Sequence, residues 1–206
     1  MGNEQDMYFQ QLFATLKVLG YEWYKDCHHL SYGYVSLPSG RMKSREGTVI
    51  DADNLIEKLT MLAEKELKKR QKLSSLELKK RSIKISLAAI KYFFLKYETL
   101  KDFIFDPKTS LSFEGETGPY IQYSYARLNS IIKKSRLKNP KYNSKYLTSE
   151  QESDLINHLY NFPEIIVEST NNCKPSLIAR YLMDLCQKSN EFYQKCPVID
   201  AEENLK

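Results

Sequence analysis

Apolar residues recur at helical spacing along most of this chain, and glycine is confined to two places. Five of the seven glycines lie within the first 50 residues, and the other two, Gly115 and Gly118, stand close together near the middle. The first 50 residues therefore show helix, turn, strand and loop, as at the end of an α/β domain. The remainder has the pattern of a helical bundle.

The periodicity predicts one helix before the first strand and six helices after it. The expected helices cover residues 4–19, 51–71, 75–97, 118–134, 148–160, 163–168 and 175–195. A strand is expected over 30–37, a loop over 38–48 and an irregular, partly extended segment over 103–113. On the second long helix the expected buried residues are Ile83, Leu87, Ile90, Phe93 and Phe94.

The helix in the middle of the chain begins at Gly118-Pro119, because proline is tolerated in a first turn, where its missing N–H has no intrahelical partner. Its apolar residues at i, i+4, i+7 and i+11 predict one buried stripe of Ile121, Tyr125, Leu128 and Ile132. Rings and polar groups share a neighbouring face: Tyr120, Tyr123, Arg127, Ser130 and Lys134. We expect this second face to lie outside the hydrophobic core.

Between Thr117 and Ser149 the chain has no acidic residue, but it has seven basic residues and five tyrosines. The net charge of the protein is +5, so its positive excess is concentrated in this stretch. Phosphates attract cations and unpaired bases stack on rings, which favours an RNA-contacting surface. The alternative is that the lysines are merely solvated and the tyrosines are half-buried core residues. The basic run over 65–84 is explained adequately by a solvated helix face.

The composition is that of a globular protein, with 42% hydrophobic and 28% charged residues. No apolar run is long enough to cross a bilayer and the first residues are polar, so we expect a cytoplasmic protein without a membrane partner. The four cysteines form no CxxC pair, and Cys27-His28-His29 lacks a second ligand pair. Free thiols and no protein-bound metal are therefore expected. We also expect a monomer.

The loop over residues 38–48 carries a second set of candidate chemistry. Two glycines frame it, and it lies between a predicted strand and a helix that Asp51 can cap. Its cations and hydroxyls are Arg41, Lys43, Arg45, Ser44 and Thr48. Such a loop can close over a polyphosphate, where backbone N–H groups and cations stabilise developing charge. Short loops of this composition are also common on ordinary surfaces.

In this setting the loop resembles the KMSKS-type loop of class I aminoacyl-tRNA synthetases, and it is most similar to the Met-Ser-x-Arg-x-Gly version of arginyl-tRNA synthetases. The stretch beginning Gln5-Asp-Met-Tyr-Phe and the run His29-Leu-Ser-Tyr-Gly33 resemble two further segments of that family. The segment 111–127, with Glu-Thr-Gly-Pro-Tyr-Ile-Gln-Tyr, resembles the hallmark of the arginyl anticodon-binding domain. Residues 173–193 resemble a later helix of the same domain.

The resemblance covers nearly the whole chain and implies a mainly α fold. Residues 1–50 would be the C-terminal remnant of a Rossmann-like α/β nucleotide-binding catalytic domain. Residues 51–206 would be a helical-bundle anticodon-binding domain, truncated at its C-terminus. The implied activity is ATP-dependent joining of arginine to tRNA through an arginyl-adenylate, with Mg²⁺ accompanying ATP.

The resemblance also implies roles for individual residues. Gln5 would help to hold arginine, and His29 and Gly33 would lie beside ATP with Met42 and Ser44. The loop residues Arg41, Met42, Lys43, Ser44 and Arg45 would act in catalysis by clamping ATP. The anticodon loop of tRNA would contact Tyr120, Tyr123, Arg127, Lys134 and Tyr193. Lys43 stands where the family usually has serine, Arg41 where it has the first lysine, and Tyr8 where it has histidine.

Several parts of the family pattern are absent from the sequence, including its His-x-Gly-His element and its arginine-binding acids. We therefore expect the C-terminal part of an arginyl-tRNA synthetase that does not activate arginine on its own. One alternative is a non-catalytic tRNA-binding module derived from a synthetase. Another is a protein–protein adaptor, for which tRNA binding would depend little on salt.

Overall fold

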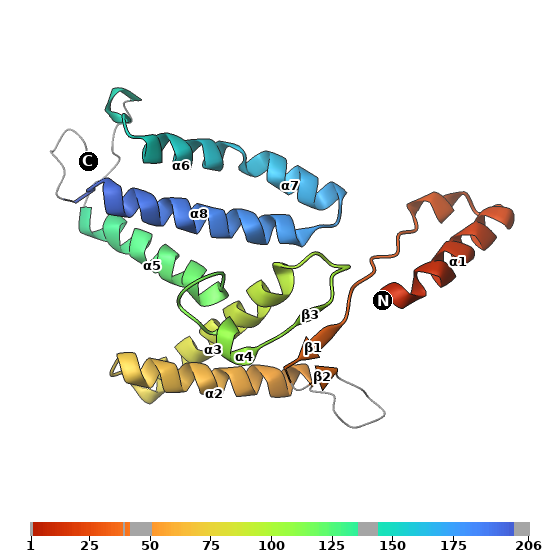
Figure 1. Ribbon diagram of the computed structural model, residues 1–206, viewed down its shortest axis with the longest axis horizontal. Helices are drawn as coiled ribbons and strands as arrows, with labels where there is room; N and C mark the ends of the chain where they lie inside the picture. Colours follow the sequence, from red (N-terminus) through yellow and green to blue (C-terminus); the bar gives the residue numbers. More distant parts are fainter. Residues whose placement is uncertain (1, 39, 42–50, 136–143, 200–206) are drawn as a thin grey trace.

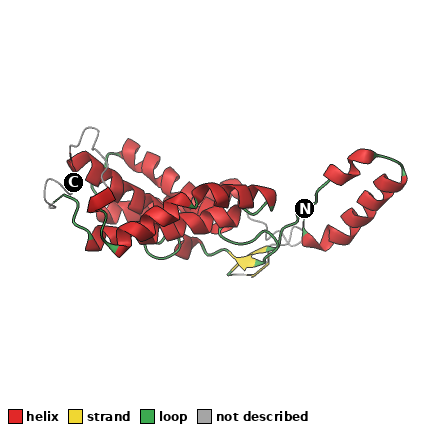
Figure 2. Ribbon diagram, turned by 90° about the horizontal axis from the view of Figure 1, so that it is seen from above, coloured by secondary structure: helices red, strands yellow, loops and turns green. Residues whose placement is uncertain are grey.

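The computed structural model describes residues 2–38, 40–41, 51–135 and 144–199. It consists of an N-terminal arm and a helical body, with a small sheet where the two meet (Figure 1). The arm projects away from the body, as the view from above shows (Figure 2). The expected mainly α architecture is confirmed.

The arm contains the short 3-10 helix η1 (Asn3–Gln5), the helix α1 (Asp6–Val18) and a second 3-10 helix, η2 (Glu22–Asp26). Gly20 makes the turn between α1 and η2 with a φ of 83°, a conformation that glycine adopts without steric cost. The helix predicted over 4–19 is therefore confirmed. Its apolar side is not buried, however, and Met7 in particular is largely exposed.

The sheet has three short strands in the order β2-β1-β3. Strand β1 (Val35–Leu37) pairs antiparallel with β2 (Gly40–Arg41) and parallel with β3 (Phe103–Ile104). The strand expected over 30–37 is thus shorter than predicted, and of its earlier residues only Tyr32 forms a bridge, to Gly2. The pairing of β1 with β3 joins the arm to the body.

Helices α2 (Ala52–Arg70) and α3 (Ser75–Leu95) form a hairpin below the rest of the body (Figure 1). Their shared core contains the buried residues Leu59, Ala63, Ala89, Phe93, Phe105 and Leu111. On α3 the expected burial of Phe93 is confirmed, but Ile83 and Phe94 are exposed. Two serines, Ser82 and Ser86, are buried instead, because small side chains let helices approach closely.

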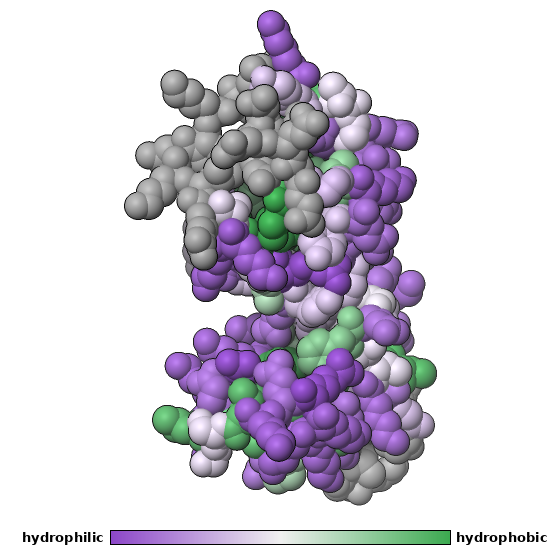
Figure 3. Space-filling model, turned by 90° about the vertical axis from the view of Figure 1, so that its left-hand side faces the viewer, coloured by the Kyte–Doolittle hydropathy of each residue, from purple (hydrophilic) through white to green (hydrophobic). Residues whose placement is uncertain are grey.

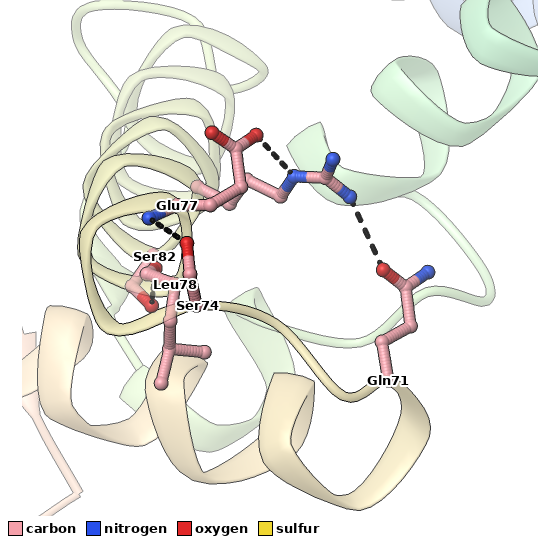
Figure 4. A network of polar contacts seen from close by, with 6 residues as sticks. Gln71, Ser74, Glu77, Leu78 and Ser82 are labelled. Atoms are coloured by element: carbon pink, nitrogen blue, oxygen red, sulfur yellow. Dashed lines mark hydrogen bonds and ion pairs between the residues drawn. The ribbon is translucent and has the colours of Figure 1, made fainter.

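Polar contacts hold the corner between α2 and α3 (Figure 4). Ser74 caps α3, since its hydroxyl accepts a hydrogen bond from the backbone N–H of Glu77 at 3.3 Å. Arg81 donates to the Glu77 carboxylate at 2.8 Å and to the Gln71 side-chain oxygen at 3.1 Å. The end of α2 is therefore tied to the first two turns of α3.

The upper part of the body follows the short helix α4 (Pro107–Ser110). It contains α5 (Gly118–Ser135), η4 (Ser144–Tyr146), α6 (Glu150–Tyr160), α7 (Phe162–Asn171) and α8 (Pro175–Lys195). Helix α8 packs against α5, α6 and α7 (Figure 1). The core of this part contains Tyr92, Ala179 and Met183, with Tyr120 and Ile121 packed against it.

The apolar stripe predicted on α5 is wrong in half of its positions. Tyr125 and Ile132 are 71% and 69% exposed, so neither contributes to the core. The helix instead buries Pro119 and Ser124, and a Cβ added at Gly118 would lie 2.1 Å from the carbonyl oxygen of Ala88. The closest contacts of α5 are therefore made at small residues, because Gly118 meets the backbone of α3 and Ser124 is bonded to Asn190 of α8.

Candidate nucleic-acid interface

Helices α5 and α8 together carry a cluster of aromatic and cationic side chains. The guanidinium carbon of Arg127 lies 4.7 Å from the ring centroid of Tyr123 and 4.9 Å from that of Tyr193. Arg127 also donates a hydrogen bond to the Tyr123 hydroxyl at 2.5 Å. The two rings are 46% and 44% exposed, so each has a surface that another flat group can reach.

Asn190, on α8, holds this cluster in place through three hydrogen bonds. Its side-chain oxygen accepts a hydrogen bond from Arg127 at 2.8 Å. Its amide nitrogen donates to the hydroxyls of Tyr120, at 2.6 Å, and of Ser124, at 3.2 Å. The partners of Arg127 are thus neutral groups, and its positive charge is not compensated by them. Nothing in the sequence pattern marks Asn190, since its partners lie more than 60 residues away in the chain.

The face of α5 that carries Tyr120, Tyr123 and Arg127 was expected to lie outside the hydrophobic core, and this is wrong for one residue. Tyr120 is half-buried, and its ring packs against the upper core. Tyr123, Ser130 and Lys134 on the same face are exposed. The structure therefore brings Tyr123, Arg127 and Tyr193 together as a reachable surface, which we call the α5–α8 cluster, and Tyr120 supports it from the interior.

A groove of about 1170 Å³ runs from this cluster toward the end of α2. Its walls are the last two turns of α2 and the first turns of α5, and its floor is α4 with the loop after it. The charged lining residues are Lys65, Glu66, Lys68, Lys69, Arg70, Lys108, Glu114 and Arg127. Seen from the end of the molecule, the surface narrows between a lower part, mostly hydrophilic, and the upper helices (Figure 3). Six cations against two carboxylates make this groove positive.

The residues expected to serve arginine and ATP lie in or next to the arm, away from the α5–α8 cluster (Figure 1). Gln5 ends η1 and is exposed. The Nδ1 atom of His29 lies 2.9 Å from the carboxylate of Asp6, and its ring stacks on Phe9 at 4.1 Å. Its Nε2 atom is buried and has no hydrogen-bond partner among the described residues.

Gly33 lies where two backbone segments come into contact. A Cβ at this position would be 2.6 Å from the carbonyl carbon of Lys101, and the Gly33 N–H donates to the carbonyl of Thr99 at 2.7 Å. Of the loop that was expected to clamp ATP, Arg41 ends β2. Met42, Lys43, Ser44 and Arg45 lie outside the described residues.

Two general properties complete the description of the candidate sites. In the described ranges, no three histidine, cysteine, aspartate or glutamate side chains gather in a way that could hold a metal ion. None of the helices in those ranges is long and apolar enough to cross a membrane.

Burial raises the pKa of the Cys186 thiol, and a hydrogen bond from Ser124 opposes that shift.

A helical bundle whose surface presents rings and uncompensated cations, joined to a short strand-and-helix segment, is typical of an RNA-binding domain attached to a second domain. Comparison with family models agrees with this class. The model of the DALR anticodon binding domain matches residues 121–206, and the model of the class I (R) tRNA synthetase catalytic domain matches residues 1–107. The chain therefore belongs to the class I (R) tRNA synthetases.

Individual relatives show the same likeness. The arginine–tRNA ligase of Flavobacterium psychrophilum is 44% identical over 100% of this chain and 35% of its own length. That of Treponema denticola is 42% identical over 98% of the chain and 36% of its own length. The chain thus spans about a third of the curated relatives it matches.

Solved structures are similar as well. The arginyl-tRNA synthetase of Thermus thermophilus superimposes with a TM-score of 0.82 at 28% identity, over 94% of this chain and 33% of that one. The arginyl-tRNA synthetase of Plasmodium falciparum gives a TM-score of 0.79 at 27% identity, over 97% of this chain and 34% of that one.

Proposed function

We propose that this chain is part of an arginine–tRNA ligase, an enzyme that joins arginine to its tRNA through an arginyl-adenylate made from ATP. In this proposal the helical part grips the anticodon loop of the tRNA, and the arm with the loop after β2 contributes to the ATP and arginine sites. The relatives' identity supports the parent activity. The α5–α8 cluster is the observation that carries the tRNA-binding role.

Within the α5–α8 cluster, we assign different tasks to the rings and to the cation. Tyr123 and Tyr193 offer exposed faces on which unpaired bases stack, while Arg127 lies between the two side chains and attracts phosphate. Lys134, exposed in the last turn of α5, adds a further phosphate contact. Tyr120 is assigned a supporting role, because its hydroxyl is bonded to Asn190 and its ring is half-buried.

In the catalytic part, we propose that Gln5 contacts arginine, since it is exposed at the start of the arm. His29 and Gly33 would shape the ATP site, because His29 is held by Asp6 and Gly33 permits close packing of two backbone segments. Arg41 and the following residues Met42, Lys43, Ser44 and Arg45 would clamp ATP, with Mg²⁺ accompanying the nucleotide. We further propose a monomer that acts in the cytoplasm.

Binding of an arginine tRNA to the purified chain tests the proposal. Replacing Tyr123 with alanine removes one exposed stacking surface, which contributes roughly 1–3 kcal/mol per base. At 1.4 kcal/mol per factor of ten, the dissociation constant should rise roughly five- to a hundred-fold. Tyr125→Ala is the matched control, because Tyr125 is a more exposed tyrosine on the same helix and lies outside the α5–α8 cluster.

Fluorescence anisotropy with labelled tRNA at moderate salt gives both constants. Equal binding by the wild type, Tyr123→Ala and Tyr125→Ala would contradict the assignment of this surface. Equal weakening by both variants would show that the two rings contribute alike and that the α5–α8 cluster has no special role.

A further inference from the structure

The groove beside the α5–α8 cluster contains a second pair of an arginine and an aromatic ring. The guanidinium carbon of Arg70, at the end of α2, lies 4.6 Å from the ring centroid of Phe113. This geometry repeats that of Arg127 over Tyr123, which lines the same groove. Arg70 is exposed and Phe113 half-buried, so the guanidinium covers the ring and can itself be reached from the groove. Unpaired RNA bases stack on arginine planes as well as on aromatic rings.

Two lysines of the groove are suited to phosphate. Lys68 and Lys69 are already paired with carboxylates, at 2.7 Å from Glu64 and 2.6 Å from Glu66. Lys65 and Lys108, in contrast, are exposed, and within the described part of the chain no carboxylate lies within ion-pair distance of either. They extend from α2 and from α4, on different sides of the groove. A phosphate between them would meet two cations that no carboxylate of the described residues already pairs with.

The walls of the groove are held by hydrogen bonds before any ligand binds. The Thr117 hydroxyl donates to the carbonyl of Ser112 at 2.6 Å and accepts from the backbone N–H of Tyr120 at 3.2 Å. The hydroxyl of Ser112 accepts from the N–H of Glu114 at 3.1 Å. On the other side, Gln71 is bonded to Arg81 of α3 (Figure 4). A preformed site loses less entropy when its ligand binds.

The dimensions also fit a nucleotide. Pockets of roughly 300–1,000 Å³ enclose drug-sized ligands. The volume of about 1170 Å³ found here therefore has room for a base, its sugar and the flanking phosphates. The groove is continuous with the surface of Tyr123, since Tyr123 and Arg127 belong to its lining. Consecutive nucleotides of one RNA strand can reach both places.

We propose that this groove is a second nucleotide site, which takes an unpaired RNA nucleotide next to the one bound at Tyr123. Its base stacks on the guanidinium of Arg70, which Phe113 supports from behind, and its phosphates contact Lys65 and Lys108. The inference rests on the proposed tRNA-binding function and extends it. It also assigns a role to part of the basic run over 65–84, which sequence analysis interpreted as a solvated helix face.

The test uses the purified chain and an RNA hairpin with the anticodon stem and loop of an arginine tRNA. Arg70→Gln removes the stacking plane and its charge while retaining much of the side-chain length. We expect its dissociation constant to rise about fivefold or more, toward the lower end of the effect of losing one stacked base. The double variant Lys65→Gln/Lys108→Gln should lower the slope of log Kd against log salt by about 1.4, or about 0.7 for each lost phosphate contact.

The charge-matched control is Lys79→Gln/Lys91→Gln, in which two exposed lysines of α3 outside the groove are changed. It should leave the slope within about 0.3 of the wild-type value, well below the 0.7 of one contact. A fully paired RNA duplex of the same length is the second probe. Circular dichroism melting of each variant checks that it is folded.

The outcomes separate the two proposals. Weaker hairpin binding by the groove variants, with the control and the duplex little affected, supports the second site. If Tyr123→Ala weakens binding but the groove variants behave like their control, the second site is wrong and the proposed function stands. If the groove variants weaken hairpin and duplex equally, the groove is a general phosphate surface and the second site is again wrong. If no variant changes binding, Tyr123→Ala included, the proposed function fails as well.

Discussion

Asn190 is the residue whose replacement best separates stability from RNA binding. Its side chain makes three hydrogen bonds at 2.6–3.2 Å, to Arg127, Tyr120 and Ser124. A typical hydrogen bond contributes about 0.5–1.5 kcal/mol net, and water can replace part of the lost contacts at this half-buried position. We therefore expect Asn190→Ala to lower the free energy of unfolding by roughly 2–3 kcal/mol. For a chain of this size the melting temperature should fall by roughly 4–12 °C.

Asn190→Asp should behave differently. Its carboxylate still accepts a hydrogen bond from Arg127, and the hydroxyls of Tyr120 and Ser124 can each rotate to donate, because a hydroxyl is both donor and acceptor. Stability should therefore stay within about 1 kcal/mol of the wild type. The new negative charge, however, compensates that of Arg127 in the middle of the α5–α8 cluster. The salt slope of tRNA binding should fall by about 0.7, the value for one phosphate contact.

Urea unfolding followed by circular dichroism gives the stabilities, and anisotropy with labelled tRNA at several salt concentrations gives the slopes. The reasoning is refuted if Asn190→Asp binds tRNA with the wild-type affinity and slope. It is also refuted if Asn190→Ala is as stable as the wild type, because the hydrogen bonds would then contribute nothing.

Two further predictions concern packing and thiol chemistry. Gly118→Ala should lower the free energy of unfolding by roughly 1–3 kcal/mol or more, because its Cβ would lie 2.1 Å from the backbone carbonyl oxygen of Ala88. The exposed control is Ser130→Ala. If the urea midpoint of Gly118→Ala falls no further than that of the control, the close α3–α5 contact is contradicted. With a disulfide reagent at pH 8, the exposed Cys173 should react quickly. Cys186 should react only after unfolding, because burial raises the pKa of its thiol. Peptide mass spectrometry of the Cys173→Ser variant reads the labelling of Cys186, and fast labelling in the folded protein would refute this prediction.

The helices could be predicted from the sequence because each depends on local signals. Apolar periodicity, a proline in the first turn and the capping residues act within about one turn of the helix end. The capping box at the start of α6 is an example, since Ser149 and Glu152 bond to each other's backbone N–H groups. The strand was predicted too long, because pairing depends on a partner, and β1 pairs with β3 almost 70 residues later.

The domain boundary near residue 50 stays a prediction for the same reason. Strand β1, from the first predicted domain, pairs with β3, from the second, and the catalytic-domain match extends over residues 1–107. A change in glycine content locates a change in local structure, but the limits of a domain depend on which distant segments share a core.

In the candidate site, too, local signals could be predicted from the sequence, and contacts between distant segments could not. The sequence by itself placed Tyr123 and Arg127 on one helix face, because i and i+4 side chains are neighbours there. The family resemblance implied Tyr193 as a further tRNA contact, and the tertiary structure placed it beside Arg127. Only the tertiary structure added Asn190 from α8, and Arg70 and Phe113 from the groove.

What the sequence determined, then, was the set of longer helices, without the short α4, the excess of cations and rings around α5 and the resemblance to the synthetase family. What only the tertiary structure decided was which side of each helix is buried. On α5 the small residues Gly118 and Ser124 are buried while Tyr125 is exposed, because neighbouring helices approach where side chains are small. Hydrophobicity along one helix does not contain that information, since the contact surface depends on the shapes of both helices.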